Sequence, residues 1–301
     1  MDIETFRYSP PFRAEVEPAL AQFGMGQGSP EIDAYFEALL KNPDMRHDAV
    51  FVTRDAAGSL GMAAIMTRPV FGGHGRMLNM LMPQDDEAKV VPFGNAMFGA
   101  AATFGEAHGI TRLGILVRDG QHLLQSFIDS TDFVSVMEHH SMGWDGDPVP
   151  LPVPETDGVT LGVYVGGDAD TNHGIATLWE WAFRRDPIGP VLTPDILEDC
   201  VAHQNIWFVV ARDQNNGRVV GVSEAGPDSF FSGIAVARSH WGTSLAEALS
   251  AATMNEFITR GHTSLFSMVR KTNRASVALH ERMNWNIKGG GKIYAPPQQT
   301  D

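Results

Sequence analysis

A group of small residues lies where a strand is expected to run into a helix, within residues 235–249. Gly242, Thr243, Ser244 and Ala246 cluster at the expected start of that helix. The first backbone N–H groups of a helix have no partner within the helix, and the helix dipole adds partial positive charge there. Small side chains let a diphosphate approach those N–H groups. Ordinary helix capping explains this segment equally well when it is taken alone.

A second element, at residues 272–285, narrows the interpretation. Its sequence is Thr-Asn-Arg-Ala-Ser-Val-Ala-Leu-His-Glu-Arg-Met-Asn-Trp. It resembles the C-terminal signature of the GNAT superfamily of acyl-CoA-dependent N-acetyltransferases. In that signature an Asn opens a helix and is followed by a small residue, a Tyr, a Glu and a final Gly-Phe pair. Asn273 takes the position of the Asn, Glu281 that of the Glu, and Trp285 that of the Phe.

The upstream segment resembles the acyl-CoA loop of the same family, usually written (Gln/Arg)-x-x-Gly-x-(Gly/Ala). Trp241 stands at its first position, Ser244 at the Gly and Ala246 at the Gly/Ala. The resemblance covers residues 158–294 well and residues 49–133 faintly. It implies acetyl-CoA as the co-substrate. The residues that the resemblance assigns to the cofactor site are Ile234, Ala235, Val236, Trp241, Gly242, Thr243, Ser244, Leu245, Ala246 and Asn273.

Departures from the family pattern bear on activity. Trp241 replaces a basic or amide residue, Ser244 replaces a Gly, and Asn284 replaces the late Gly. A serine still permits close approach and can donate its own hydroxyl hydrogen bond. Without the basic side chain, pyrophosphate binding would depend mainly on backbone amides and on Arg238. A catalytically degenerate protein that binds CoA without chemistry is therefore one alternative to an enzyme.

The resemblance also assigns catalytic groups. Acetyl transfer to an amine requires that a proton leave the ammonium group and that the departing thiolate gain one. In the family a Tyr of the signature helix usually protonates the thiolate, and His280 stands at that position. Glu224 lies on the strand before the cofactor strand, where family enzymes often carry a base that acts through water. A surface histidine and an exposed strand acid are the competing interpretations; Asp228 and Ser232 are lesser candidates.

Residues 158–294 are expected to fold in the order β-α-α-β-β-β-α-β-α-β, with antiparallel strands first. The expected strands are 158–165, 206–211, 218–225, 230–236, 263–269 and 286–294; the expected helices are 173–184, one opened by Thr193-Pro194, 241–260 and 273–282. Three aromatic residues on the first helix, Trp179, Trp181 and Phe183, are expected in the core rather than in the substrate site.

The first half repeats this order more faintly. The expected strands are 49–53, 59–67, 77–82 and 111–117, and the expected helices are 91–108 and 121–130. Gly109 and Gly261 each close the long helix immediately before a strand, which indicates an internal duplication.

The loop of the first half that corresponds to the acyl-CoA loop carries three consecutive acids and no glycine pattern. Asp85, Asp86 and Glu87 would repel a diphosphate. We therefore expect the first half to stabilise the pair and shape the substrate cleft without binding CoA. The tandem arrangement resembles that of mycothiol synthase.

The sequence thus predicts a mixed α/β fold of two tandem GNAT-like domains, each a mixed, mostly antiparallel sheet flanked by helices. Residues 1–147 form the degenerate domain and residues 156–301 the domain with the acyl-CoA site. Residues 148–155, with a proline at alternate positions, form an extended linker.

Composition limits the class of protein. The chain is 43% apolar and 19% charged, as globular proteins are. Its 36 acidic and 22 basic residues give a net charge of −14, which argues against a nucleic-acid partner and suits a small-molecule amine. The single cysteine, Cys200, predicts a buried structural thiol and a reduced compartment. With no signal peptide or membrane-length apolar run, a cytoplasmic monomer or homodimer without membrane partners is expected.

Other chemistries fit less well. His139 and His140 are adjacent and diverge, without further ligands at metal spacing, so no metal is expected. Gly289-Gly290-Gly291-Lys292 lacks the spacing and helix of a P-loop. The leading hypothesis is an acetyl-CoA-dependent N-acetyltransferase that transfers directly to a small-molecule amine in a ternary complex. The alternatives are another acyl donor, a decarboxylase of the same fold, or a regulatory CoA-binding module.

Overall fold

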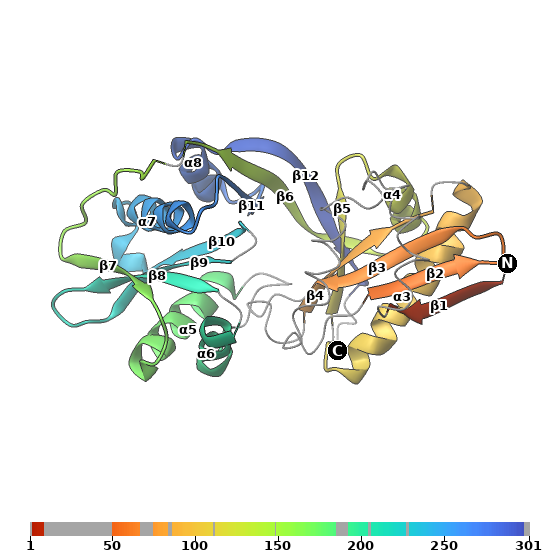
Figure 1. Cartoon of the computed structure of the whole chain (residues 1–301), viewed down its shortest axis with the longest axis horizontal. Helices are drawn as coiled ribbons and strands as arrows, with labels where there is room; N and C mark the ends of the chain where they lie inside the picture. Colours follow the sequence, from red (N-terminus) through yellow and green to blue (C-terminus); the bar gives the residue numbers. More distant parts are fainter. Residues whose placement is uncertain are drawn as a thin grey trace. The chain divides into compact units, whose positions relative to one another are not determined.

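The computed structural model describes residues 2–8, 50–66, 75–83, 86–110, 112–147, 149–184, 192–203, 206–226 and 229–297. The chain forms two compact units: unit 1 is Met1–Met137 with Lys292–Asp301, and unit 2 is Glu138–Gly291. Each combines strands with helices (Figure 1), so the fold is mixed α/β, as predicted. Within the described ranges, no helix is both long enough and apolar enough to cross a membrane.

In unit 1 the strand order is β1-β2-β3-β4-β5-β12. The first four strands pair antiparallel and β4 pairs parallel with β5. Two strands, β6 and β12, have residues in both units. The elements are β1 (Ile3–Arg7), β2 (Val50–Asp55), β3 (Leu60–Met66), β4 (Gly75–Leu81), η3 (Glu87–Lys89), α3 (Val90–Ala107), β5 (Arg112–Arg118), α4 (His122–Asp129), β6 (Val134–Asp145) and β12 (Asn286–Ala295).

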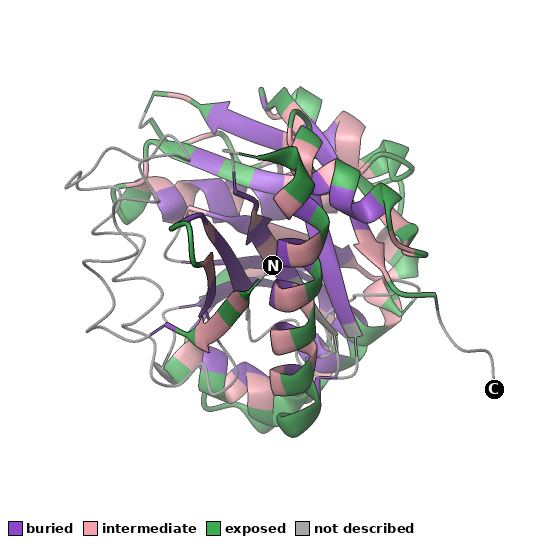
Figure 2. Ribbon diagram, turned by 90° about the vertical axis from the view of Figure 1, so that its right-hand side faces the viewer, coloured by how far each residue is buried: buried purple, intermediate pink, exposed green. Residues whose placement is uncertain are grey.

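The core of unit 1 forms between its sheet and the helices α3 and α4. Val90, Phe93 and Met97 recur at helical spacing along α3 and are fully buried. A Cβ atom on Gly94 would overlap the ring of Phe127 on α4, so the glycine lets the two helices approach closely. Figure 2 shows buried residues along the strands and exposed ones on the outer turns of the helices.

Unit 2 contains a four-stranded antiparallel sheet in the order β10-β9-β8-β7 and a second set of strands in the order β12-β6-β11. The elements are β7 (Val159–Tyr164), α5 (Ala169–Phe183), α6 (Pro194–His203), β8 (Trp207–Asp213), β9 (Val219–Ala225), β10 (Phe231–Val236), η4 (Arg238–His240), α7 (Leu245–Thr259), β11 (Ser264–Arg270) and α8 (Arg274–Arg282).

Opposite faces of the four-stranded sheet are covered by different helices (Figure 1). On one face α7 packs so closely that a Cβ atom on Gly221 would come within 2.7 Å of Leu249. On the other face lie α5 and α6, where a Cβ atom on Gly233 would meet Phe183 at 3.0 Å.

Every element expected in residues 158–294 is present, with shifted bounds. α5 begins at Ala169 rather than at residue 173, because Asp168 caps it by accepting hydrogen bonds from the N–H groups of Asp170 and Thr171. α7 begins at Leu245 rather than at residue 241, because η4 and a turn come first. The expected closing glycine Gly109 follows the last helical turn with φ +72°.

The sequence did not predict two strands, β1 and β6. β6 pairs antiparallel with β11, from Ser264↔Asp145 to Arg270↔His139. Its residue Trp144 is 4% exposed and belongs to the core of unit 2. The compact units therefore divide the chain within β6 and β12, whereas the predicted boundaries lie at the proline-rich segment.

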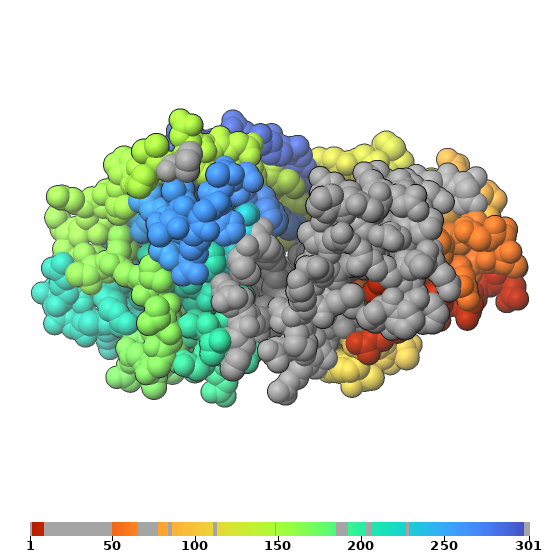
Figure 3. All heavy atoms as spheres, viewed as in Figure 1, coloured from red at the N-terminus to blue at the C-terminus, as the bar shows by residue number. Residues whose placement is uncertain are grey.

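The described part of the proline-rich segment, residues 149–155, is held against α7. The Leu151 N–H donates to Asn255 Oδ1 at 2.6 Å, and Asn255 Nδ2 donates back to the Leu151 carbonyl at 2.9 Å. Figure 3 shows this segment beside α7 on the surface of unit 2. It is extended, as expected, and it is also anchored.

Candidate functional site

The edge of β10 that faces β11 is open. The two strands share one isolated parallel bridge, Phe230↔Phe266, where the Phe266 N–H donates to the Ser229 carbonyl at 3.0 Å. Beyond this bridge they belong to separate sheets, and β10 is the end strand of its own sheet. Because the other edge of β10 pairs with β9, backbone groups on the open edge can pair with an extended ligand.

A β-bulge interrupts the start of β10. Phe231 pairs with Ala225 and Gly233 pairs with Glu224, so Ser232 is the extra residue. A bulge bends the strand and changes the direction of its backbone groups. Gly233 is needed here because a side chain would press on Phe183 of α5. This bulge was missed in the sequence, although an isolated glycine within a strand is a known signal for one.

The loop at the other end of β10 leads into α7. Gly242 has φ +79°, a conformation that favours glycine. The first helical hydrogen bond runs from the Ala248 N–H to the Ser244 carbonyl at 2.9 Å, so the N–H groups before Ala248 lack helical partners. The hydroxyl of Thr243 accepts from the Leu245 N–H at 3.3 Å. This end of α7 has the form of an anion site.

Trp241 and Ser244, which differ from the family pattern in this loop, both form contacts with other parts of the chain. The indole Nε1 of Trp241 donates to the Val236 carbonyl at 3.0 Å, and its ring lies 5.7 Å from that of Trp181. Trp241 nevertheless remains 60% exposed. The hydroxyl of Ser244 donates to the Glu155 carbonyl at 3.0 Å, so in this conformation it is not directed to a ligand.

Glu224 is 1% exposed, which excludes the interpretation that it is an exposed strand acid. It lies opposite Gly233 at the bulge and faces α6. Burial, and secondarily the charge of Glu224, raises the pKa of the Cys200 thiol. Cys200 is a free, buried cysteine, as predicted.

His280 is 6% exposed, so it is not a surface histidine. Its Nδ1 lies 2.8 Å from the Ser276 carbonyl, which can only accept, so Nδ1 carries the proton. Nε2 is buried and has no hydrogen-bond partner among the described residues. The ring meets Phe231 edge-on, at 5.9 Å between centroids. Burial lowers the pKa of His280, so the imidazole is neutral at pH 7 and Nε2 is an acceptor.

Two motif residues at the ends of the signature helix α8 have roles in the backbone geometry of the helix. Asn273 caps the helix, its side chain accepting from the Ser276 N–H at 3.2 Å. Asn284 has φ +60°, where the family carries a glycine, and asparagine tolerates that conformation better than most residues. The next residue, Trp285, is 4% exposed and donates to Met254 Sδ at 3.4 Å. Asn273 is thus a helix cap, and its contact with a cofactor stays a prediction.

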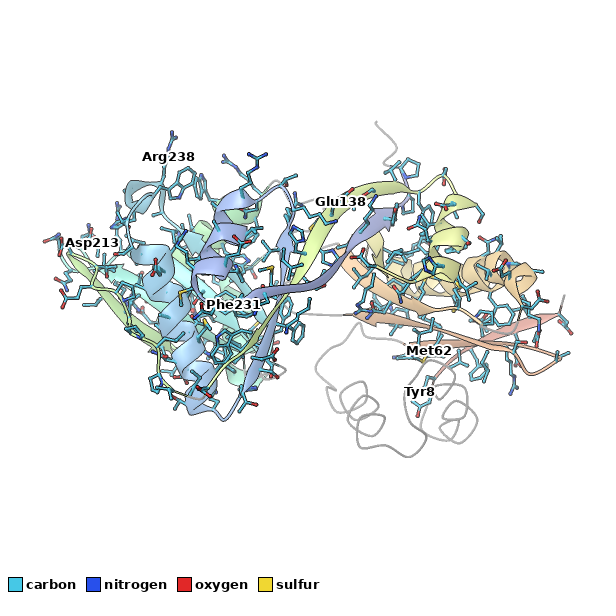
Figure 4. The ribbon with its side chains drawn as sticks, turned by 90° about the horizontal axis from the view of Figure 1, so that it is seen from above. Tyr8, Met62, Glu138, Asp213, Phe231 and Arg238 are labelled. Carbon is cyan, nitrogen blue, oxygen red and sulfur yellow. The ribbon has the colours of Figure 1, made fainter. Side chains whose placement is uncertain are left out.

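The two predicted catalytic residues approach the bulge from opposite sides. Glu224 pairs with the bulge from β9, and His280 contacts its first residue, Phe231, from α8. Phe231, labelled in Figure 4, is 2% exposed and lies inside unit 2. The loop at residues 241–246 lies at the far end of the same strand. The loop predicted to bind the cofactor therefore lies at one end of β10, and the contacts of Glu224 and His280 lie at the other end.

Some sequence predictions fall elsewhere. Trp179 is buried, as predicted, but Trp181 lies against exposed Trp241 and is not a core residue. Asp228 lies outside the described residues, as does Asp85 of the first half. His139 is buried on β6. In the part of the chain that the structure describes, no three His, Cys, Asp or Glu side chains gather as metal ligands would.

Comparison with known proteins gives a family match for part of the sequence and a fold match for the whole chain. Residues 174–285 match the sequence model of the acetyltransferase (GNAT) family. No curated protein matches the sequence significantly. The whole chain is similar in fold to a GNAT-family N-acetyltransferase from Sphaerobacter thermophilus, with a TM-score of 0.71 and 14% identity over 99% of this chain and 97% of that one.

Two further solved structures show the same fold. A tandem GNAT protein from the clavulanic acid biosynthesis pathway has a TM-score of 0.65 and 12% identity over 99% of this chain and 100% of that one. A glucosamine N-acetyltransferase region of a fungal multi-domain protein has a TM-score of 0.64 and 14% identity over 98% of this chain and 38% of that one. The chain therefore has the tandem GNAT fold, and residues 174–285 carry the sequence pattern of the GNAT superfamily.

Proposed function

We propose that the protein is an acyl-CoA-dependent N-acyltransferase that uses acetyl-CoA and a small-molecule amine. The observation that carries this proposal is the open edge of β10, which joins the bulge at Phe231 and Gly233 to the N-terminal end of α7. The amides of the pantetheine arm pair with this edge as a strand would. Within residues 241–246, the N–H groups of Trp241, Thr243 and Leu245 donate to the protein. The diphosphate binds the N–H groups of Gly242, Ser244 and Ala246, and the thioester then lies at the bulge.

Glu224 and His280 supply the proton transfers in this scheme. Glu224 removes a proton from the ammonium group through water, and the free amine attacks the thioester carbon. His280 Nε2, an acceptor in the neutral ring, takes the proton that the nitrogen of the adduct loses. It then gives this proton to the sulfur as the carbon–sulfur bond breaks, and returns to the neutral form.

Unit 1 has a supporting role in this proposal. Asp86 and Glu87 place carboxylates immediately before α3, and Asp86 uses its own to cap η3. An anion is disfavoured next to these groups.

A regulatory module that binds acyl-CoA without chemistry is the second candidate. Two loop side chains favour it because they form hydrogen bonds within the protein. Trp241 donates to the Val236 carbonyl, and Ser244 donates to the Glu155 carbonyl. Such a module would share the cleft and lack turnover.

The decisive experiment combines calorimetry of acetyl-CoA with a thiol-release assay on pooled amines. An enzyme gives one bound acetyl-CoA per chain and amine-dependent thiol release, and the regulatory module gives binding alone. A panel of other acyl-CoAs, with detection of CO₂, separates other acyl transfer and decarboxylation. Absence of any saturable acyl-CoA binding would refute both candidates.

A further inference from the structure

A groove of about 970 Å³ runs along α5, on the face of the four-stranded sheet opposite α7. One wall is the exposed side of α5, from Asp168 to Arg184. The other wall comes from the turn between β8 and β9, and from Ala237 and Arg238 after β10. The α5 wall therefore lies on the face of the sheet opposite α7, whereas Ala237 and Arg238 lead into the loop before α7, where the diphosphate is predicted to bind.

Close packing of α5 on the sheet forms the floor of the groove. A Cβ atom on Gly174 would come within 2.9 Å of the Val219 side chain, so glycine lets the helix backbone approach β9. On either side of Gly174 along α5, larger residues line the two ends of the groove. Thr177, the next residue on the same face, is exposed inside the groove.

The groove is rich in cations, although the chain carries a net charge of −14. Its lining includes four arginines, Arg184, Arg212, Arg218 and Arg238, against two acids. Neither Arg218 nor Arg238 forms an ion pair within the described residues. Figure 4 shows the Arg238 side chain projecting from the edge of the ribbon.

One of the two acids already has hydrogen-bond and ion-pair partners. Asp168 accepts from Asp170 N–H at 3.2 Å as the cap of α5 and also accepts from the Thr171 hydroxyl. Arg212 Nη2 lies 3.6 Å from Asp168 Oδ2. The hydrogen bond from Thr171, and more weakly Arg212, lowers the pKa of Asp168. Three arginines then face Asp170 alone, an arrangement that attracts an anion.

An aromatic surface lies at one end of the groove. Trp181 lines the groove, and the Arg184 guanidinium lies 5.8 Å from its ring centroid. Trp241 packs 5.7 Å from the same ring. A planar group can stack beside Trp181 while arginines bind phosphate oxygens through paired N–H groups.

We propose that this groove is a binding site for a small molecule that combines two or more phosphate groups with a planar ring, as nucleoside polyphosphates do. The groove adjoins the predicted acyl-CoA site, because Arg238 and Trp241 border both, while Arg184 and Arg218 border the groove alone. The proposal holds whether or not the protein is a transferase. Phosphate groups on a planar nucleoside also occur at the nucleotide end of CoA, so the experiment must distinguish a free nucleotide from bound CoA.

The experiment titrates the full chain with ATP and, separately, with tripolyphosphate, in calorimetry without divalent metal. We expect saturable binding of both probes, tighter for ATP, weakening as NaCl rises from about 50 to 300 mM because salt screens the charges. Arg184→Ala with Arg218→Ala should weaken ATP binding at least tenfold. Thr177→Glu, which adds a negative charge and removes no arginine, should weaken it similarly.

Arg118→Ala, on an exposed arginine of β5, is the matched control and should leave ATP affinity unchanged. Saturating acetyl-CoA should change the affinity for ATP by less than about twofold. The groove variants should bind acetyl-CoA with the affinity of the wild type. Competition between ATP and acetyl-CoA would show that the groove is the nucleotide end of the CoA site and would overturn the proposal. Absence of saturable binding, or equal binding by wild type and groove variants of unchanged thermal stability, would also overturn it.

Discussion

Each unit places a long helix between two neighbouring strands, and these strand pairs differ between the units. In unit 1, β4 and β5 form a parallel ladder from Gly75↔Arg112 to Leu78↔Ile115. In unit 2, β10 and β11 share only the bridge Phe230↔Phe266 and lie in separate sheets. The same order of elements therefore leaves a whole strand edge open in unit 2, while part of that edge is paired in unit 1.

The helices that follow these strands also begin differently. Before α3, Lys89 forms an ion pair with Asp55 at 3.0 Å, and the first helical residue, Val90, is 2% exposed. Before α7, the residues from Gly242 to Ser244 are small and mostly exposed. The comparison indicates that an anion can reach the helix N–H groups in unit 2, and that packed and charged side chains obstruct this approach in unit 1.

The largest effect is expected from Gly242→Glu. The new carboxylate would stand at the predicted diphosphate position, and a side chain is strained at φ +79°. Acetyl-CoA affinity in calorimetry should fall by more than about a hundredfold, or about 2.7 kcal/mol.

Gly261→Glu is the matched control, because Gly261 lies just beyond the other end of α7 with φ +87° and nothing within 4 Å of its added Cβ. It introduces the same charge and similar strain, and it should leave acetyl-CoA affinity unchanged. Equal affinity in the two variants would move the site away from α7. A stoichiometry of two acetyl-CoA molecules per chain would break the contrast between the units.

Glu224→Gln tests the base at the bulge. The amide keeps the shape of the side chain and cannot take a proton, so kcat should fall about 10²- to 10⁴-fold while acetyl-CoA affinity changes little. Glu180→Gln, on the exposed side of α5, serves as control and should behave as wild type. Full activity of the Glu224 variant would leave Glu224 a structural residue.

His280→Ala should lower kcat about 10- to 1,000-fold with nearly intact acetyl-CoA binding, because the interaction is made mainly in the transition state. His280→Tyr, which restores a proton donor, should retain more activity than alanine. If the alanine variant matches wild type across the pH range, the proton comes from water.

The same residue predicts a dependence of stability on pH. Burial lowers the pKa of His280 in the folded state. Its contribution to the free energy of unfolding is thus present above the unfolded-state pKa of about 6.5, and is lost as the pH falls through the lowered folded-state value. Urea unfolding of His280→Phe should show less loss of stability between about pH 7 and pH 5 than wild type. An unchanged pH profile would contradict the burial of a neutral ring.

The smallest effects are expected on stability, from substitutions in α3 of unit 1, to which we assign a supporting role. Gly94→Ala should destabilise the protein by about 1–3 kcal/mol, because the new methyl group overlaps the Phe127 ring. Gly99→Ala on the same helix meets nothing within 4 Å and should stabilise it by about 0.5–1 kcal/mol. Thermal unfolding measures both effects, and acetyl-CoA affinity should stay constant. A change in affinity would give unit 1 a direct part in the cofactor site.

Local features of the fold could be predicted from the sequence because they depend on neighbouring residues. Gly109 and Gly261 both have positive φ after a long helix. In each case the N–H group of the glycine donates to the carbonyl three residues earlier. Asn273 caps α8, and Cys200 is buried in α6. In each case the residue type and its immediate neighbours set the geometry.

The tertiary structure decided what those elements form together. β6 is mixed in polarity, and it is a strand because β11, more than a hundred residues later, supplies its hydrogen-bond partners. The bulge in β10 follows from its register with β9, and the burial of Glu224 and His280 follows from packing on its two sides. The sequence by itself determined the order of elements within residues 158–294 and the glycines that follow the two long helices. Strand pairing and burial depend on distant partners, so only the folded chain decided which strand edge is open and which charged or titratable groups surround it.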